Sequence, residues 1–198
     1  MHSTDHAFIA EYLAQSSSAM QAFEQSSQQA NVLAAMADAV VATMRAGGKL
    51  LIAGNGGSAG DAQHIAGEFT GRMLYDRPPL AAVALHADTS ALTAIANDYG
   101  FAAVFERQVQ ALGRPGDALL GLSTSGRSEN VLRAMQAARK GGLNTLGFTG
   151  ECGGGMAEYA DILLRAPATL TPIVQQIHIT AGHVLCALVE RALHPRSE

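Results

Sequence analysis

The sequence lacks several features that would place it in a common class of protein. It contains no tryptophan and only two cysteines in 198 residues, Cys152 and Cys186, which are not spaced like metal-ligand or redox pairs. We therefore expect ordinary thiols in a reducing compartment. No stretch of eighteen apolar residues is present, so no segment is expected to span a membrane. The N-terminus has no basic segment followed by an apolar run, which argues against a signal peptide. These absences predict a cytoplasmic protein.

Charge is also scarce. Only 15% of the residues are charged, the net charge is −4, and lysine and arginine are scattered along the chain. This distribution argues against a nucleic-acid partner, because counterion release needs a concentrated basic surface. With 48% hydrophobic residues and so few charges, much apolar surface must be hidden. That balance favours an oligomer.

Short apolar runs alternate with helical patterns along most of the chain. The runs predict strands at 49–54, 80–85, 117–123, 144–150 and 161–166, and the helical patterns cover 6–25, 29–45, 58–70, 89–97, 101–112, 128–140 and 171–193, with a short helix near 154–160. Continuous apolar strands between helices predict a parallel sheet covered on both faces. Right-handed crossovers then give a three-layer, doubly wound α/β fold with a five-stranded parallel sheet. We expect a single domain over 1–198, with an N-terminal helical pair at 1–47 and an α/β core at 48–198.

The loop after the first strand is rich in glycine. Ligands of such sheets bind beyond the carboxyl ends of the strands. Gly54, Gly56 and Gly57 follow a strand and open a helix, so backbone N–H groups and the helix N-terminus suit an anion. The loop lacks the lysine of a nucleotide-phosphate loop. A loose match to the dinucleotide fingerprint, with Asp88 as the ribose-binding acid, stays open as an alternative.

The loop after the third strand carries four hydroxyls within six residues: Ser123, Thr124, Ser125 and Ser128. Such a cluster can surround a phosphomonoester with O–H and N–H donors. The alternative is that Ser128 merely caps the following helix, with Glu129 in its first turn. One capping serine needs no three companions, so we favour phosphate binding.

Two helices carry polar residues suited to a metal. His64 and Glu68 are four residues apart and share one helix face, although a surface pair or a core histidine would show the same spacing. The last helix, with Thr171 as its predicted N-cap and Pro172 next, places His183 two turns after Gln175. Two imidazoles, a carboxylate and an amide oxygen fit a tetrahedral zinc site. Glutamine is an unusual ligand, so spacing alone does not establish it.

Two further positions stay open. Asn97 and Asp98 end the helix after the second strand, and they suit either a simple turn or a contact with substrate. His178 lies in apolar surroundings on the last helix, where a buried polar side chain needs a partner.

Taken together, these motifs resemble the sugar-isomerase (SIS) family and, within it, the bacterial phosphoheptose isomerases. The resemblance rests on Gly54-Asn55-Gly56-Gly57-Ser58-Ala59, His64-x-x-x-Glu68, Asn97-Asp98, Ser123-Thr124-Ser125-Gly-x-Ser128 and the helix with Gln175 and His183, and it covers essentially the whole chain. It implies conversion of sedoheptulose 7-phosphate to D-glycero-D-manno-heptose 7-phosphate. This is the first step toward the ADP- or GDP-heptose used for lipopolysaccharide or capsule. It also implies a cytoplasmic homotetramer with active sites near the subunit interfaces.

The resemblance further implies a role for individual residues. Glu68 is the expected base and His183 the expected acid, and one zinc ion per subunit is expected on His64, Glu68, Gln175 and His183. The expected substrate contacts are Asn55, Gly56, Gly57, Glu68, Asn97, Asp98, Ser123, Thr124, Ser125, Ser128 and Gln175. One departure is Arg127, where relatives usually have asparagine; an added cation beside the hydroxyls should not hurt phosphate binding.

The expected chemistry suits these residues, because moving a proton through an enediol needs a base at carbon and an acid or metal at oxygen. Whether zinc takes part or is incidental stays open, since a zinc-bound carboxylate is a poorer base. Two other functions are also considered. Some relatives on this fold are adaptors that bind the bacterial replication initiator, but they lack the complete catalytic set. A sugar-phosphate-sensing regulator would need a basic helix-turn-helix domain, which the sequence does not show.

Overall fold

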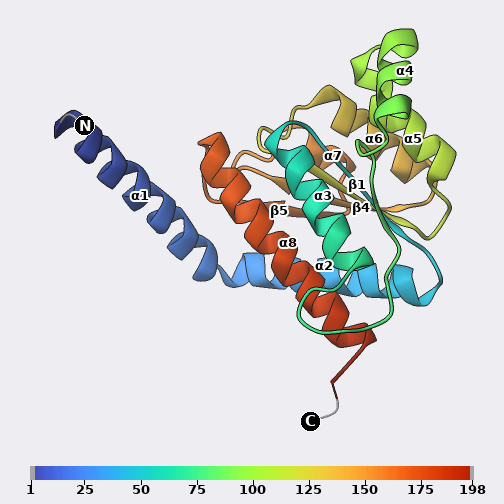
Figure 1. The fold of residues 1–198 in the computed structure, drawn as a ribbon, viewed down its shortest axis with the longest axis horizontal. Coiled ribbons are helices and arrows are strands. Elements are labelled where there is room, and N and C mark those ends of the chain that lie inside the picture. Colours follow the sequence, from blue (N-terminus) through green and yellow to red (C-terminus); the bar gives the residue numbers. More distant parts are fainter. Residues whose placement is uncertain (1–2, 197–198) are drawn as a thin grey trace.

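The computed structural model describes residues 3–196 and contains a five-stranded parallel sheet with helices on both faces (Figure 1). The strands are β1 (Leu50–Gly54), β2 (Ala82–Ala84), β3 (Ala118–Ser123), β4 (Asn144–Thr149) and β5 (Ile162–Arg165). Their order in the sheet is β2-β1-β3-β4-β5, and every neighbouring pair is parallel. The predicted doubly wound α/β fold is confirmed. The second strand is shorter than predicted, with three residues in place of 80–85.

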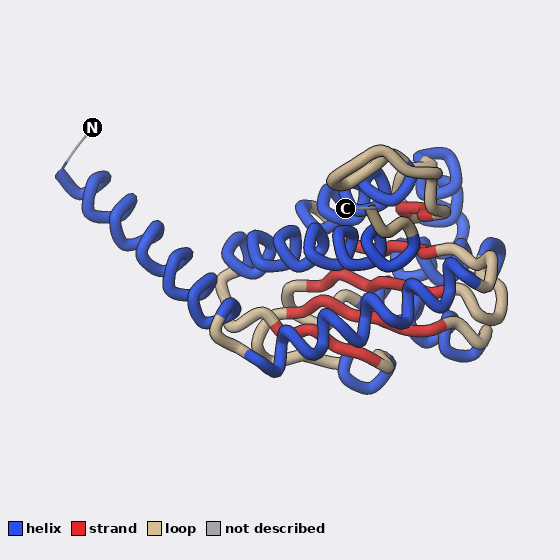
Figure 2. Tube along the Cα trace, turned by 90° about the horizontal axis from the view of Figure 1, so that it is seen from below, coloured by secondary structure: helices blue, strands red, loops and turns tan. Residues whose placement is uncertain are grey.

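Helices cover both faces of this sheet, whereas α1 lies apart from both layers (Figure 2). The helices are α1 (Ser3–Glu24), α2 (Ser27–Arg45), α3 (Gly57–Thr70), α4 (Thr89–Tyr99), α5 (Val104–Leu112), α6 (Glu129–Lys140), α7 (Met156–Tyr159) and α8 (Thr171–Leu193), with a 3-10 turn at Phe101–Ala103. Side chains alternate along a strand between the two faces of a sheet. Accordingly, Leu50 and Ile52 belong to the core under α2, α3 and α8, whereas Leu51 and Ala53 belong to the core under α5 and α6. The two cores therefore hold the strands between the helix layers, and the loops that follow the strands extend from this frame.

Helix α1 projects away from the body of the protein (Figures 1 and 2). The sheet face nearest to it is already covered by α2, α3 and α8, so the apolar residues of α1 have no sheet to pack on. Phe8 is 65% exposed and Leu13 is 61% exposed. Further along α1, Ser16 donates a hydrogen bond to Gln176 of α8 at 2.5 Å, and Phe23, next to the last residue of the helix, is buried. The two N-terminal helices therefore form, but they do not pack along each other as a pair.

Helix α8 differs in one respect from its prediction. The residue at its N-cap is Leu170, and no side chain caps the helix, so the prediction of Thr171 as N-cap is wrong. Pro172 does lie in the first turn, where its missing N–H costs nothing. By length and composition α8 could cross a membrane, but half of its most apolar window is buried inside the protein. It is the central helix of one core, packed between α2 and α3.

Candidate functional site

The glycine loop makes a tight turn between β1 and α3. Gly56, at the N-cap of α3, has a φ of 56°, a left-handed conformation that strains other residues. A side chain at Gly54 would collide with the backbone of Ser58. Glycine is therefore required at these two positions for the chain to turn directly from strand to helix. The turn points the free N–H groups of the first turn of α3 into the space beyond the strands.

Asn55, within this loop, is held by a partner that the sequence analysis missed. Its side-chain amide donates to Asn130 Oδ1, and the Asn130 amide donates back to Asn55 Oδ1, both at 2.9 Å. Asn130 is only 3% exposed and also accepts a hydrogen bond from the backbone of Val131. The pair joins the loop after β1 to the first turn of α6. A single asparagine at a helix start gives no periodic signal, which is why sequence inspection passed over it.

A cavity of about 310 Å³ lies between the glycine loop and the hydroxyl loop. It is lined by Asn55, Gly56, Gly57, Ser58, Leu122, Ser123, Thr124, Ser128, Thr171 and Gln175. Two of these lining residues, Ser123 and Ser128, form a hydroxyl–hydroxyl hydrogen bond of 2.8 Å. Ser128 occupies the N-cap position of α6 but makes no capping bond with its side chain. Its hydroxyl is thus directed to the cluster, as phosphate binding requires, and the capping alternative loses its support.

Ser125 lies at the edge of this cluster. Its hydroxyl accepts a hydrogen bond from the backbone N–H of Arg127 at 3.2 Å. Thr124, Ser125 and Arg127 line an adjoining hollow of about 170 Å³, together with Cys152. The hydroxyl loop therefore faces two hollows, and Thr124 lines both of them.

The hydroxyl loop is held from behind by the loop after β4. Gly126 has a φ of 64°, and a Cβ on it would overlap the carbonyl oxygen of Gly153. A Cβ on Gly154 would lie 2.5 Å from the carbonyl oxygen of Gly126. That carbonyl accepts a hydrogen bond from Met156 N–H at 3.3 Å. The two loops thus meet backbone to backbone, which leaves the hydroxyl loop little freedom to move.

Three potential metal ligands meet where α3 lies beside α8 (Figure 1). His64 Nε2 lies 2.9 Å from His183 Nε2 and 3.2 Å from Glu68 Oε1, and ligand atoms of all three lie within 4.8 Å of one another. The helices can approach closely here because Gly182 has no side chain; a Cβ at this position would collide with Ile65. The His64 side chain is 51% exposed and that of Glu68 is 21% exposed. The group could therefore hold a metal ion that a substrate can reach.

Gln175 and His178 have different surroundings. The Gln175 amide lies directly over Gly57, where a Cβ would come within 2.5 Å of Nε2 and 2.8 Å of Oε1. It lines the cavity between the two loops. His178 is fully buried with its ring beside Phe148, and burial lowers its pKa to about 4. His178 is therefore a neutral core residue and no candidate for the acid.

The structure does not bring Asn97 and Asp98 to the cavity within one chain. Both are exposed in the last turn of α4, where the Asn97 amide donates to Asp98 Oδ1 at 2.8 Å. Asp88, the candidate ribose-binding acid, instead caps α4 by accepting a hydrogen bond from Ala91 N–H at 2.9 Å. The capping hydrogen bond accounts for Asp88, so the dinucleotide alternative loses its ribose-binding acid and keeps only the glycine pattern.

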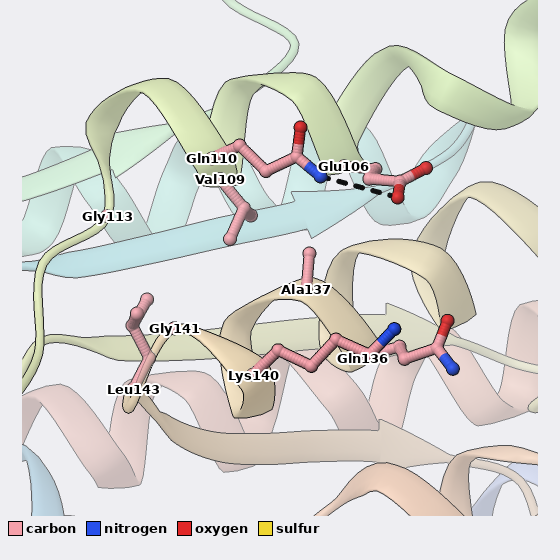
Figure 3. Close-up of a pocket in the computed structure, with 9 residues that line it drawn as sticks. All are labelled: Glu106, Val109, Gln110, Gly113, Gln136, Ala137, Lys140, Gly141 and Leu143. Carbon is pink, nitrogen blue, oxygen red and sulfur yellow. Dashed lines mark hydrogen bonds between the residues drawn. The ribbon is translucent and has the colours of Figure 1, made fainter.

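A separate hollow of about 320 Å³ lies between α5 and α6 (Figure 3). Its lining residues are Glu106, Val109, Gln110, Gly113, Gln136, Ala137, Lys140, Gly141 and Leu143. These residues come from α5, from the last two turns of α6 and from the connections that lead into β3 and β4, so the hollow lies toward the starts of these strands, opposite the hydroxyl loop. Its lining has neither a hydroxyl cluster nor a histidine, so this hollow is not the candidate site.

Comparison with known proteins places the chain in one family. Residues 11–150 match the family model described as the SIS domain. The phosphoheptose isomerase of Rhodospirillum rubrum is 56% identical over 164 residues, covering 83% of this chain and 87% of that protein. The chain belongs to the phosphoheptose isomerase family. The relative from Bradyrhizobium sp. ORS 278 is 53% identical and covers 93% of both chains.

Solved structures of phosphoheptose isomerases have the same fold. That from Neisseria gonorrhoeae is 42% identical, with a TM-score of 0.87 over 93% of this chain and 98% of its own. That from Francisella tularensis is 35% identical, with a TM-score of 0.90 over 96% and 100%. For a phosphoheptose isomerase, the hydroxyl-lined cavity suits the phosphate of a sugar phosphate, and the group of His64, Glu68 and His183 suits a metal.

Proposed function

We propose that this protein converts sedoheptulose 7-phosphate to D-glycero-D-manno-heptose 7-phosphate, with Glu68 as the base and His183 as the acid. Membership of the phosphoheptose isomerases supports the reaction. The observation that carries the assignment of roles is the meeting of Glu68 and His183 on α3 and α8, the two helices whose first turns line the cavity with the hydroxyl cluster. In the same proposal the reaction takes place in the cytoplasm and supplies heptose for lipopolysaccharide or capsule.

In the proposed mechanism the phosphate anchors the substrate. Ser123, Thr124, Ser125 and Ser128 donate hydrogen bonds to its oxygens, and the first turn of α3 adds N–H groups and a favourable dipole. Hydrogen bonds to a charged group contribute roughly 1.5–3 kcal/mol each. Anchoring the distant phosphate in this way orients the reacting carbons at the other end of the sugar.

Two pairs of proton transfers then convert the ketose to the aldose. The Glu68 carboxylate takes a proton from C1 of the ketose, the C–H electrons form the C1=C2 bond, and the carbonyl electrons move to O2. His183 gives a proton to O2, which yields the enediol. Glu68 returns its proton to C2 while His183 accepts the proton of O1, so that C1 becomes the aldehyde. Both residues end in their starting protonation states, as a catalytic cycle requires.

We propose that one zinc ion per subunit binds to His64, Glu68 and His183, with Gln175 as the fourth ligand. The donor set supports this, because two imidazole nitrogens and a carboxylate oxygen converge within 4.8 Å, and zinc prefers such ligands. When bound, zinc would supply Lewis-acid polarisation of a substrate oxygen. Gln175 lies two turns before His183 on α8, with its amide over Gly57.

We also propose a homotetramer of single-domain subunits spanning 1–198. The exposed Phe8 and Leu13 of the projecting helix α1 support burial against neighbouring subunits. A contact of Asn97 and Asp98 with substrate then requires a neighbouring subunit, because both lie outside the cavity of their own chain.

Glu68→Gln tests the proposal, because it keeps the size of the side chain and removes its basicity. We expect kcat to fall by at least about 10²-fold, the usual contribution of a positioned base, while binding of inorganic phosphate is kept. NMR of sedoheptulose 7-phosphate conversion measures turnover, and Glu106→Gln, in the distant hollow, is the matched control. Full activity of Glu68→Gln would refute the assignment of the base.

His64→Ala separates the two possible roles of zinc. Turnover that falls together with the zinc content, as measured by atomic emission, identifies zinc as part of the reaction; turnover that persists without zinc identifies an incidental ion. If the unmodified protein is inactive with the correct substrate and added zinc, the isomerase proposal fails and the adaptor function is left standing.

A further inference from the structure

A buried ion pair joins helix α8 to the segment that follows α3. The Glu190 side chain is 0% exposed, the Arg77 side chain is 2% exposed, and Nε and Oε2 are 3.1 Å apart. Glu190 also accepts hydrogen bonds from the backbone N–H groups of Met73 at 2.9 Å and Leu74 at 2.8 Å. Burial opposes the charge on Glu190, but these donors outweigh it and hold the pKa below its usual range. A buried pair is tolerated only when it is hydrogen-bonded as fully as this.

The other side of the Arg77 guanidinium binds the end of α3. Nη2 donates to the carbonyl oxygen of Glu68 at 2.7 Å, and Nη1 donates to that of Phe69 at 2.7 Å. Nη1 also lies 3.1 Å from the carbonyl oxygens of Gly71 and Pro78. The last carbonyls of a helix have no partner within the helix. Arg77 supplies these partners, and its positive charge suits the helix C-terminus.

The pair therefore connects the backbone of Glu68 to the helix that carries His183. Glu190 follows His183 by seven residues, which is two turns, and so lies on the same side of α8. We propose that Arg77 and Glu190 are positioning residues that set the Glu68 carboxylate relative to His183. This inference rests on the proposed role of Glu68 as the base.

Glu68 needs such support because of its place in α3. It lies two residues before the helix ends at Thr70, in the turn where an unsupported helix frays. A shift of about 1 Å in a reacting group can cost about 10²-fold in rate. Phe69 anchors one side of this last turn in the core, at 1% exposure, and Arg77 binds the carbonyl oxygens of Glu68 and Phe69. Only the planar guanidinium, with five donors, can bind a carboxylate and several carbonyls at once, so lysine is not an equivalent.

Arg77→Lys tests the proposal, because it keeps the charge and removes the fork of donors. We expect kcat for sedoheptulose 7-phosphate to fall about tenfold or more while KM changes less than about threefold, since the phosphate contacts are distant. We also expect weaker zinc retention in dialysis against a chelator, because Glu68 is one of the proposed ligands. Zinc retention is read independently of turnover.

Lys49→Met is the matched control for the loss of a buried pair. Lys49 Nζ lies 2.6 Å from Asp117 Oδ2, with side-chain exposures of 25% and 4%, at the edge of the sheet opposite the site. We expect this variant to lose thermal stability while its kcat stays within about twofold of the original. A stability loss in Arg77→Lys with the same unchanged kcat and zinc retention would overturn the positioning role and leave only a structural one.

Glu190→Gln provides a second variant if Arg77→Lys does not fold. It keeps the shape and an acceptor oxygen, so a decrease in kcat at unchanged KM supports the proposal and an unchanged kcat overturns it. Glu68→Gln, measured in parallel, separates the two assignments. An inactive Glu68→Gln with a fully active Arg77→Lys overturns the positioning role alone, whereas an active Glu68→Gln overturns the base assignment and the positioning role with it.

Discussion

Because Gly57 lies against the Gln175 amide, a substitution at Gly57 can displace the Gln175 side chain while residue 175 itself stays unchanged. In Gly57→Ala the new Cβ would lie 2.5 Å from Gln175 Nε2, whereas ordinary contacts begin near 3.4 Å. The amide, at the far end of a flexible side chain, must therefore move by about 1 Å, a displacement that can cost about 10²-fold in rate. The fold should survive, because Gly57 begins α3 and alanine favours a helix more than glycine does.

The assay compares kcat, KM and zinc content of Gly57→Ala with those of Gly60→Ala. Gly60 lies in the same helix, and a Cβ there meets nothing within 4 Å. This control should gain about 0.5–1 kcal/mol of stability with unchanged kinetics. We expect Gly57→Ala to be as stable as the original protein and to lose about tenfold or more in kcat/KM.

A double-mutant cycle with Gln175→Ala identifies the cause of the loss. Because alanine at 175 removes the clashing amide, Gly57→Ala should have little further effect in that background. Unchanged kinetics of Gly57→Ala would refute the reasoning that the position of this amide matters. Equal effects in both backgrounds would show that the new methyl group acts on the glycine loop itself.

Three other predictions follow from the fold and the site. Ser125→Ala combined with Ser128→Ala should raise KM strongly and weaken binding of inorganic phosphate in calorimetry, by roughly 1.5–3 kcal/mol for each lost hydrogen bond; unchanged values would remove this loop from the site. Phe8→Ser with Leu13→Asp should shift sedimentation toward smaller species, because both side chains are exposed on α1, and an unchanged assembly would contradict a role for this helix. Burial raises the pKa of Asp117, but hydrogen bonds from Lys49 and Arg114 outweigh it and hold that pKa below its ordinary value. Its contribution to the free energy of unfolding is therefore present above about pH 4 and is lost as the pH falls through the lowered pKa. The free energy of unfolding of Asp117→Asn, measured by denaturation, should therefore fall less between neutral and acidic pH than that of the original protein. An unchanged pH dependence would contradict this.

The sequence predicted the sheet well because buried parallel strands are continuous apolar runs bounded by turn residues. The limits of α8, 171–193, are also confirmed, because its apolar periodicity runs unbroken between Pro172 and the final polar residues. The loops after β1 and β3 could be placed together because parallel strands end at one edge of a sheet. Their meeting in one cavity follows from β1 and β3 being neighbours.

What could not be predicted depends on contacts between distant segments. The direction of α1 cannot be predicted from its periodicity. Periodicity shows that a helix has an apolar side, but it does not show which surface covers that side. The Arg77–Glu190 pair joins residues 113 positions apart, and no spacing rule reaches so far. A single acidic residue within the apolar run of α8 was the signal available for Glu190. Threonine before Pro172 predicts an N-cap because threonine is common at that position, whereas in the structure Thr171 lines the cavity.

The backbone contact of Gly126 with Gly153 and Gly154 has a consequence for how this sequence can vary. Each loop needs the absence of a side chain on the other, so a replacement on either side cannot be compensated by shrinking its neighbour, which is already the smallest residue. Neither single nor double substitutions at these positions should therefore be tolerated. In a saturation mutagenesis experiment selected for activity, Gly126 and Gly154 should be as intolerant as Glu68, although they supply no reactive group. Intolerance to substitution in this protein thus marks two different kinds of residue, and only the geometry of the loops separates them.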